Sequence, residues 1–216
     1  ICALDDNAGN TPDKTAISGS RISLTWRELH DEVVAVAGRL QGVSTLGVLM
    51  ENSPAWIVTD LAAIYAGVVC IPLPGFFSDE QLRHAIKDAQ IDAVITDNPE
   101  RLASLLQSSR ESSLLIAGSQ CVQSSFPVDG ADRKHSTTVK VTYTSGTTGR
   151  PKGAMITHRN LNSAMMNFFA DVDAIDHKDC VIHCAPLSHR SGLYATPYIA
   201  MGGNNIVPLS GGFDPA

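Results

Sequence analysis

Short apolar runs alternate along the chain with longer amphipathic or apolar stretches. The short runs lie at 45–50, 68–73, 93–97, 114–118, 139–144, 180–186 and 205–209. Such runs predict strands, and the stretches between them predict helices. Short, uniformly apolar strands separated by helices are typical of a buried parallel sheet. The predicted fold class is therefore α/β, an open, doubly wound, mostly parallel sheet flanked by helices.

Capping residues mark where several of these helices begin. Thr25 and Glu28 have the spacing of a capping box, and so do Ser78 and Gln81. A serine followed by a proline at 53–54 predicts a third start, because proline suits the first helical position. Further helices are predicted at 99–108, from residue 157 and from residue 188.

One apolar stretch has the length of a membrane span. It starts at Ala55, runs AWIVTDLAAIYAGVVCIPL, and contains Asp60. Gly67 ends its helical part, and the prolines at 72 and 74 interrupt the segment after that glycine. A buried helix leading into a buried strand explains the stretch better, so no membrane span is predicted.

Two features bear on how the chain is divided. Residues 119–138 are polar and irregular in pattern, which predicts a long surface connection or a boundary between two sub-parts. Asp214 and Pro215 have the signature of a helix start, and Ile1 is not an initiator methionine. We therefore expect residues 1–216 to be an incomplete N-terminal domain of a longer protein, without its C-terminal domain.

Composition narrows the functional classes. Hydrophobic residues make up 44% of the 216 residues and charged residues 18%, which supports a packed core. The net charge of −6 opposes non-specific attraction to nucleic acid, so no nucleic-acid partner is predicted. These quantities carry no information on the oligomeric state.

The cysteines indicate a reducing, cytoplasmic compartment. There are 5 of them, at scattered spacings and without a Cys-x-x-Cys pair, which is typical of reduced thiols. Cys180 and Cys184 lie roughly 13 Å apart along a predicted strand, too far for a disulfide or a shared metal ion. His183 between them points to the opposite face of that strand, so no metal site is predicted.

The strand at 139–144 leads into a loop rich in glycine and hydroxyl residues. The residues of this loop are Thr144, Ser145, Gly146, Thr147, Thr148 and Gly149, followed by Pro151, Lys152 and Gly153. Glycines allow the backbone to approach a ligand closely, and consecutive N–H groups form a concave anion site. Hydroxyl donors and the ammonium group of Lys152 complete a set that suits a polyphosphate.

Two well-known nucleotide loops differ from this one. The Walker A pattern needs a Gly-Lys-Ser/Thr step, whereas Gly149 is followed by Arg150, Pro151 and Lys152. The dinucleotide-binding pattern G-x-G-x-x-G does not fit the loop either. A flexible linker is the alternative for any run of serine, threonine and glycine. The apolar strand before the loop and the ordered sequence GRPKG after it favour a binding loop.

The longer stretch YTSGTTGRPKGAMITHRNL resembles the phosphate-binding signature of the adenylate-forming enzymes. This superfamily comprises acyl-CoA synthetases, nonribosomal-peptide adenylation domains and beetle luciferases. Weaker resemblances occur in the family's order, in LTWRELHDEVVAVAGRL, DLAAIYAGVVCIPLPGFFSDEQLRHAIKDAQIDAVITD and CAPLSHRSGLY. The resemblance implies that a carboxylic acid and ATP form an acyl-adenylate with release of pyrophosphate. A thiol of CoA or of a carrier protein then takes the acyl group.

The resemblance also implies roles for single residues. The ATP phosphates would be contacted by Thr144, Ser145, Gly146, Thr147, Thr148 and Lys152, while Gly149 and Gly153 would be structural and Pro151 would fix the exit of the loop. His189 matches a histidine that often lines the acyl pocket, whereas His158 is expected to be a helix-terminal surface residue. The motif lacks the aspartate that holds an amine in amino-acid-activating relatives, which favours a fatty or aryl acid. Ser188 replaces an aromatic residue often found before that histidine.

Other functional groups of this superfamily are expected outside residues 1–216. They are the adenine- and Mg²⁺-binding motif with its glutamate, the ribose-binding aspartate and the catalytic lysine of the C-terminal domain. No catalytic residue or metal ligand is therefore assigned in this chain, which alone is expected to be inactive. Two alternatives stay open: a nucleotide phosphotransferase or hydrolase with an atypical glycine loop, and a non-catalytic nucleotide-binding protein.

Overall fold

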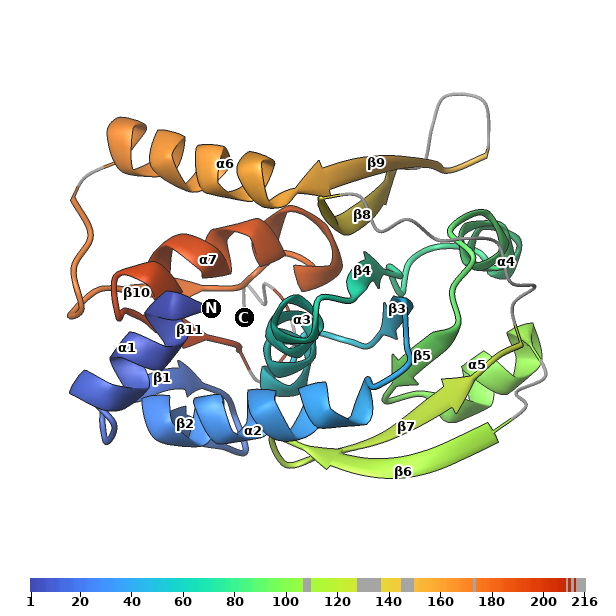
Figure 1. Ribbon diagram of the computed structural model, residues 1–216, viewed down its shortest axis with the longest axis horizontal. Coiled ribbons are helices and arrows are strands. Elements are labelled where there is room, and N and C mark those ends of the chain that lie inside the picture. The colour runs from blue at the N-terminus through green and yellow to red at the C-terminus, as the bar shows by residue number, and fades with distance from the viewer. Residues whose placement is uncertain are drawn as a thin grey trace.

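The computed structural model describes residues 1–106, 110–127, 137–144, 150–172, 174–208, 210 and 212. These residues form two sheets with helices between and around them (Figure 1). In order across it, the larger sheet consists of β6 (Arg110–Ile116), β7 (Ser119–Ser125), β5 (Ala93–Thr96), β3 (Thr45–Leu49), β4 (Val69–Pro72), β8 (Thr138–Thr144) and β9 (Lys152–Thr157). The smaller sheet consists of β10 (Cys180–Ile182), β11 (Asn204–Ile206), β1 (Thr15–Ser18) and β2 (Ser23–Thr25).

The described helices are α1 (Cys2–Asn10), α2 (Trp26–Arg39), α3 (Pro54–Ala66), α4 (Asp79–Asp88), α5 (Pro99–Leu105), α6 (His158–Asp171) and α7 (Gly192–Ala200). A π-helical turn, Leu187–Ser191, leads directly into α7. In the larger sheet, β3 pairs in parallel with β4 and β5, and β4 pairs in parallel with β8. Antiparallel pairs are confined to the two sides of this parallel centre.

Side chains of the central strands alternate between two hydrophobic cores. Leu46 and Val48 of β3 belong to the core that includes α2 and α3. Leu49 of the same strand and Val94 of β5 belong to the core that includes α4 and α5. Helices therefore cover both faces of the sheet, which is why these strands are apolar along their whole length. The predicted α/β class with a parallel-rich sheet flanked by helices is confirmed.

Helix α3 lies between the two sheets and is buried along most of its length. The hydroxyl of Ser53 caps it, Pro54 is its first residue, and Gly67 ends it in the left-handed conformation with φ 70°. The predicted buried helix followed by a strand is thus confirmed. Within the described part of the chain, no helix has both the length and the apolar character needed to cross a membrane.

Both predicted capping boxes are present, at the starts of α2 and α4. The prediction for residues 119–138 was wrong in part, because residues 119–125 form β7 and pair with β5 and β6. The polar composition of β7 hid this strand from a pattern based on apolar runs. Residues 128–136 of that stretch lie outside the described residues.

Other boundaries also differ from the predictions. The strand β9 lies between the glycine loop and α6, whereas the helix was predicted to follow the loop directly. β10 and β11 are shorter than the strands predicted at 180–186 and 205–209, and α5 ends before residue 108. Elements α1, β1 and β2 were not predicted. The helix start predicted at 214 lies outside the described residues.

A buried ion pair attaches β8 to α3. The ammonium nitrogen of Lys140 is 2.7 Å from Oδ1 of Asp60, and both side chains are almost inaccessible to solvent. The same nitrogen lies 5.6 Å from the ring centroid of Trp56. Burial alone lowers the pKa of Lys140, but Asp60 and the neighbouring Cys70 outweigh this and raise it. Lys140 is therefore charged. Its charge explains why an aspartate, Asp60, is found inside the otherwise apolar helix α3.

Removing one member of this pair is expected to destabilise the chain strongly. Lys140→Met should lower the free energy of unfolding by about 3–5 kcal/mol, because Asp60 is left buried without a counter-charge. In the double variant Asp60→Leu/Lys140→Met the free energy of unfolding should fall by less, since no charge remains buried. Urea unfolding followed by tryptophan fluorescence measures both values.

Lys87→Met is the matched control, because Lys87 is exposed on α4. The free energy of unfolding of this variant should differ from that of the wild type by no more than about 0.5 kcal/mol. A single Lys140 variant as stable as the wild type would contradict the importance of the pair.

Candidate functional site

The predicted phosphate loop joins the two strands of a hairpin at the edge of the larger sheet (Figure 1). Strands β8 and β9 are antiparallel, and Thr144 lies opposite Lys152 in their register. Both residues are exposed, and side chains opposite each other in an antiparallel pair share one face. The hairpin thus brings a hydroxyl and an ammonium group together at the base of the loop. The predicted site residues Ser145, Gly146, Thr147, Thr148 and Gly149 lie outside the described residues.

Steric contacts explain why residue 153 is a glycine. Gly153 lies opposite Tyr143, and a Cβ built on it would be 2.7 Å from Cγ1 of Val141 and 3.1 Å from Cζ of Tyr143. Valine is stiff at χ1 and the tyrosine is buried, so neither side chain can move aside easily. Glycine therefore permits the two strands to pair closely beneath the loop.

Helix α4 braces both strands of the hairpin. Nε2 of His84 lies 3.1 Å from the carbonyl oxygen of Pro151, which only accepts hydrogen bonds, so the histidine donates. The hydroxyl of Tyr143 donates to Oδ2 of Asp88 at 2.6 Å. Burial, with the Asp88 carboxylate, raises the pKa of Tyr143, which keeps this donor protonated. The buried Pro151 is thereby held just before β9.

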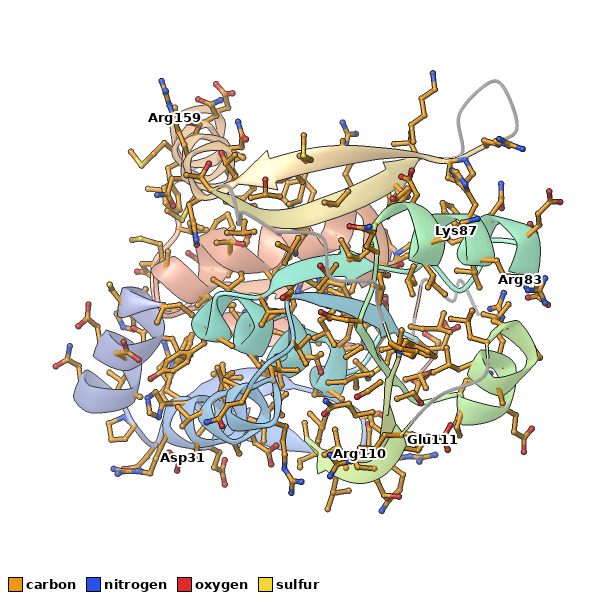
Figure 2. All side chains as sticks on the ribbon, turned by 45° about the vertical axis from the view of Figure 1, so that its right-hand side comes forward. Asp31, Arg83, Lys87, Arg110, Glu111 and Arg159 are labelled. Atoms are coloured by element: carbon orange, nitrogen blue, oxygen red, sulfur yellow. The ribbon has the colours of Figure 1, made fainter. Side chains whose placement is uncertain are left out.

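A polar hollow of about 770 Å³ lies between α4 and the end of the loop. Its lining includes three cationic side chains, Arg83, Lys87 and Arg150, and two carboxylates, Glu80 and Asp88. Figure 2 shows Arg83 and Lys87 on α4, and the guanidinium of Arg83 also donates to backbone carbonyls at the end of α5. The surroundings of the hairpin base are therefore moderately basic, although the chain as a whole is acidic.

The predicted acyl-site histidine lies on the turn Leu187–Ser191. His189 is exposed and has non-helical backbone angles, φ −124° and ψ −129°. Asn52, just before α3, holds the start of this turn: its Oδ1 accepts the N–H of Leu187 at 2.7 Å, and its Nδ2 donates to the carbonyl of Ala185 at 2.9 Å. Nothing in the sequence pattern indicated this role of Asn52, because its partners lie more than 130 residues away.

An apolar groove of about 570 Å³ runs between α6 and α7. Phe168 of α6 contacts Tyr194 of α7, with ring centroids 5.7 Å apart. Two charged residues among those described line the same groove, Arg190 next to His189 on the turn and Asp171 at the end of α6. His189 itself is not part of the described lining. His158 is the exposed first residue of α6, as predicted.

Cys180 and Cys184 differ from His183 in their exposure to solvent. Cys180 and Cys184 are exposed free thiols, whereas His183 is fully buried. Among the described residues, no group of three histidine, cysteine, aspartate or glutamate side chains comes together as a metal site.

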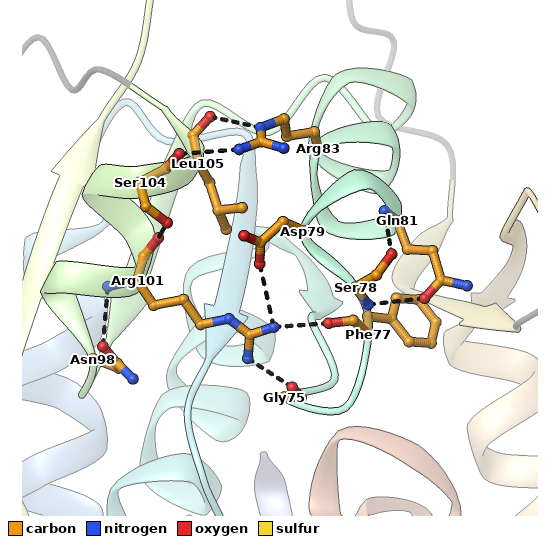
Figure 3. Close-up of polar contacts among 10 residues, drawn as sticks. All are labelled: Gly75, Phe77, Ser78, Asp79, Gln81, Arg83, Asn98, Arg101, Ser104 and Leu105. Atoms are coloured by element: carbon orange, nitrogen blue, oxygen red, sulfur yellow. Dashed lines mark hydrogen bonds and ion pairs between the residues drawn. The ribbon is translucent and has the colours of Figure 1, made fainter.

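A second hollow, of about 460 Å³, lies at the carboxyl ends of β3 and β5 and was not predicted. Glu51 and Asp97 line it, and burial together with the Glu51 carboxylate raises the pKa of Asp97. On the same wall, Arg101 of α5 donates to the carbonyls of Gly75 and Phe77 at 2.6 and 2.7 Å (Figure 3). These bonds fix the segment between β4 and α4 that underlies the brace on the hairpin. The sequence signal for this hollow was Asp97, the last residue of the strand predicted at 93–97.

Comparison with known proteins agrees with this geometry. Residues 4–216 match the family described as AMP-binding enzyme. The chain is 29% identical to a 2-succinylbenzoate–CoA ligase of Bacillus cereus (strain Q1), over 85% of this chain and 38% of that protein. It is 31% identical to a feruloyl-CoA synthase of Amycolatopsis sp., over 95% of this chain and 42% of that protein. The chain thus spans less than half the length of these relatives.

Solved structures share the fold. The inhibitor-bound N-terminal domain of FACL13 from Mycobacterium tuberculosis superimposes with a TM-score of 0.78 at 18% identity, covering 99% of this chain and 57% of that one. ATP-bound MatB from Rhodopseudomonas palustris gives 0.76 at 24% identity, covering 99% of this chain and 46% of that one. The family match over almost the whole length, joined to the hairpin loop and the parallel-rich fold, shows that this chain belongs to the AMP-binding enzymes.

Proposed function

We propose that this chain is the N-terminal, nucleotide- and acid-binding part of an AMP-forming acid–thiol ligase. The whole protein would join a carboxylic acid to ATP, release pyrophosphate, and transfer the acyl group from the adenylate to CoA or a carrier thiol. The observation that carries the proposal is the β8–β9 hairpin, which holds Thr144 opposite Lys152 at the base of the glycine loop.

The loop residues would hold the phosphates of ATP. The proposed contacts are Thr144, Ser145, Gly146, Thr147, Thr148 and Lys152, with Gly149, Pro151 and Gly153 shaping the loop. When the acid's carboxylate attacks the α-phosphorus, negative charge builds on the departing pyrophosphate. Donors fixed before the reaction stabilise this charge without reorganising, and the brace from α4 keeps the base of the loop in place. Bound Mg²⁺ would neutralise further phosphate charge, through a glutamate in another part of the protein.

The groove between α6 and α7 would receive the acid. Its mostly aromatic and aliphatic lining suits an apolar or aryl group, and Arg190 offers a cation for a carboxylate, while Asp171 adds one negative charge to the lining. No aspartate lies in the segment 186–194, where amino-acid-activating relatives hold the substrate amine. The similar proteins named for succinylbenzoate and for a feruloyl group support an aryl acid. His189, exposed on the turn beside Arg190, is the proposed histidine of the acyl site.

The proposed reaction predicts acid-dependent exchange of labelled pyrophosphate into ATP by the full-length protein. An aryl acid should support exchange better than an amino acid, because the segment 186–194 has no carboxylate at the position that holds the amine in amino-acid-activating relatives; Asp171 is the carboxylate that lines the groove. The 216-residue chain alone should show no exchange, since the family's glutamate motif and C-terminal lysine are expected elsewhere. Release of phosphate instead of pyrophosphate by the full-length protein, or exchange by the chain alone, would refute this assignment.

Lys152→Ala tests the loop directly by nucleotide binding. Losing one charge-assisted contact should weaken ATP binding by about 10- to 100-fold, measured by isothermal titration calorimetry. The affinity for AMP should change less, because AMP lacks the β- and γ-phosphates. Lys178→Ala is the matched control, since Lys178 is exposed and lies outside the hairpin, between α6 and β10. An equal loss of ATP affinity in the two variants would mean that Lys152 acts only through net charge.

A further inference from the structure

A buried row of polar side chains lies behind the turn Leu187–Ser191. The ring of His183, which follows β10, lies between Ser191 at the end of the turn and Asn205 in β11. Nδ1 of His183 is 2.9 Å from Oγ of Ser191, and Nε2 is 3.0 Å from Oδ1 of Asn205. The exposed fractions of His183, Ser191 and Asn205 are 0%, 7% and 0%.

The orientation of the Asn205 amide decides where the protons lie. With Oδ1 toward the ring, as the structure places it, Nε2 of His183 carries the hydrogen, and Nδ2 of Asn205 is buried without a partner among the described residues. The ring is neutral, because burial lowers the pKa of His183. Its Nδ1 is therefore an acceptor, and the hydroxyl of Ser191 donates to it. The hydrogen bonds thus run in one direction, from Ser191 through His183 to Asn205.

A serine, a histidine and an amide in a row could also suggest a hydrolytic nucleophile with its base. Burial argues against that function here. Ser191 is only 7% exposed, which leaves little room for a substrate carbonyl to approach its hydroxyl. What the row does contact is the end of the turn, which leaves a role in positioning.

Both ends of the turn are fastened. Asn52 holds Leu187 at the start, and His183 holds Ser191 at the end. Immediately after Ser191, a Cβ on Gly192 would lie 2.3 Å from the carbonyl oxygen of Leu187, so the turn is also tightly closed on itself. The two exposed basic residues between the fastened ends are His189 and Arg190.

We propose that His183, together with Ser191 and Asn205, is a positioning residue for the acid-binding groove, because this hydrogen-bonded row sets the direction in which the turn presents His189 and Arg190. The inference rests on the proposed function only for what the groove binds. Asn205 lies in β11, outside the turn, and its side chain is hydrogen-bonded to His183, which connects it to the turn.

The first test uses the 216-residue chain and nuclear magnetic resonance. In the wild type, long-range ¹⁵N–¹H spectra should show His183 neutral with the hydrogen on Nε2. Ser191→Ala and Asn205→Ala should each shift the resonances of His189 and Arg190 while leaving Tyr143, in β8, unchanged. The matched control is Ser124→Ala, which removes a hydroxyl from a serine in β7 that is 1% exposed.

This experiment overturns the proposal if His183 is charged or carries its hydrogen on Nδ1. It also does so if Asn205→Ala leaves His189 and Arg190 unshifted, because the row would then transmit nothing. Should Ser191→Ala fail to fold, the Asn205→Ala comparison gives the same decision from the far end of the row.

The second test measures steady-state kinetics of the full-length protein. Ser191→Ala should raise the KM for the acid by about fivefold to tenfold, the effect of one lost hydrogen bond, with the KM for ATP within about twofold. Equal increases in both KM values, or the same change with Ser124→Ala, would show a general structural effect and reject positioning. If the protein activates no acid, the proposed function fails, and the resonance experiment still decides the role of His183.

Discussion

The buried ion pair between Lys140 and Asp60 is the constraint that orders the rest of the molecule. A charge cannot be left without a partner in an apolar interior, so β8 must lie against α3. Through this contact α3 serves both halves of the site. Asp60 in the middle of α3 holds β8, the strand that ends at Thr144. Asn52, just before α3, holds the start of the turn that carries His189. Trp56 on the same helix lies near Lys140 and would be 3.0 Å from a Cβ on Gly192.

The sequence predicted those parts of the fold whose cause is local. Capping boxes, the cap at Ser53 and the left-handed Gly67 depend on neighbours a few residues away, and all are present. β7 was missed because its buried positions include Gln123 and Ser124, whose burial depends on pairing with β5 and β6. β9 was missed because it is an edge strand with mostly exposed residues, so it has no apolar pattern to detect.

In the candidate site, too, local motifs could be predicted and contacts between distant residues could not. The glycine and hydroxyl loop is a contiguous motif, so its place at the end of a strand could be predicted from the sequence. The contacts that hold it could not, because His84 meets Pro151 across 67 positions and Tyr143 meets Asp88 across 55. His183 stood out only as a residue pointing away from two cysteines. Its function in the turn depends on Asn205, which the pattern of the chain does not mark in any way.

Charge is unevenly distributed along the carboxyl edge of the larger sheet, and this distribution selects where a polyanion can bind. Near β3 and β5 the edge presents the carboxylates of Glu51, Asp97 and Glu100, while the guanidinium of Arg101 is engaged with backbone carbonyls and Asp79. Near β8 it presents the cations of Lys87, Arg150 and Lys152, with the carboxylates of Glu80 and Asp88 in the same hollow. Both regions lie at the same edge because β3, β4, β5 and β8 are parallel. The first region would repel a triphosphate, whereas cations outnumber carboxylates in the second, which supports the proposed nucleotide site at the hairpin.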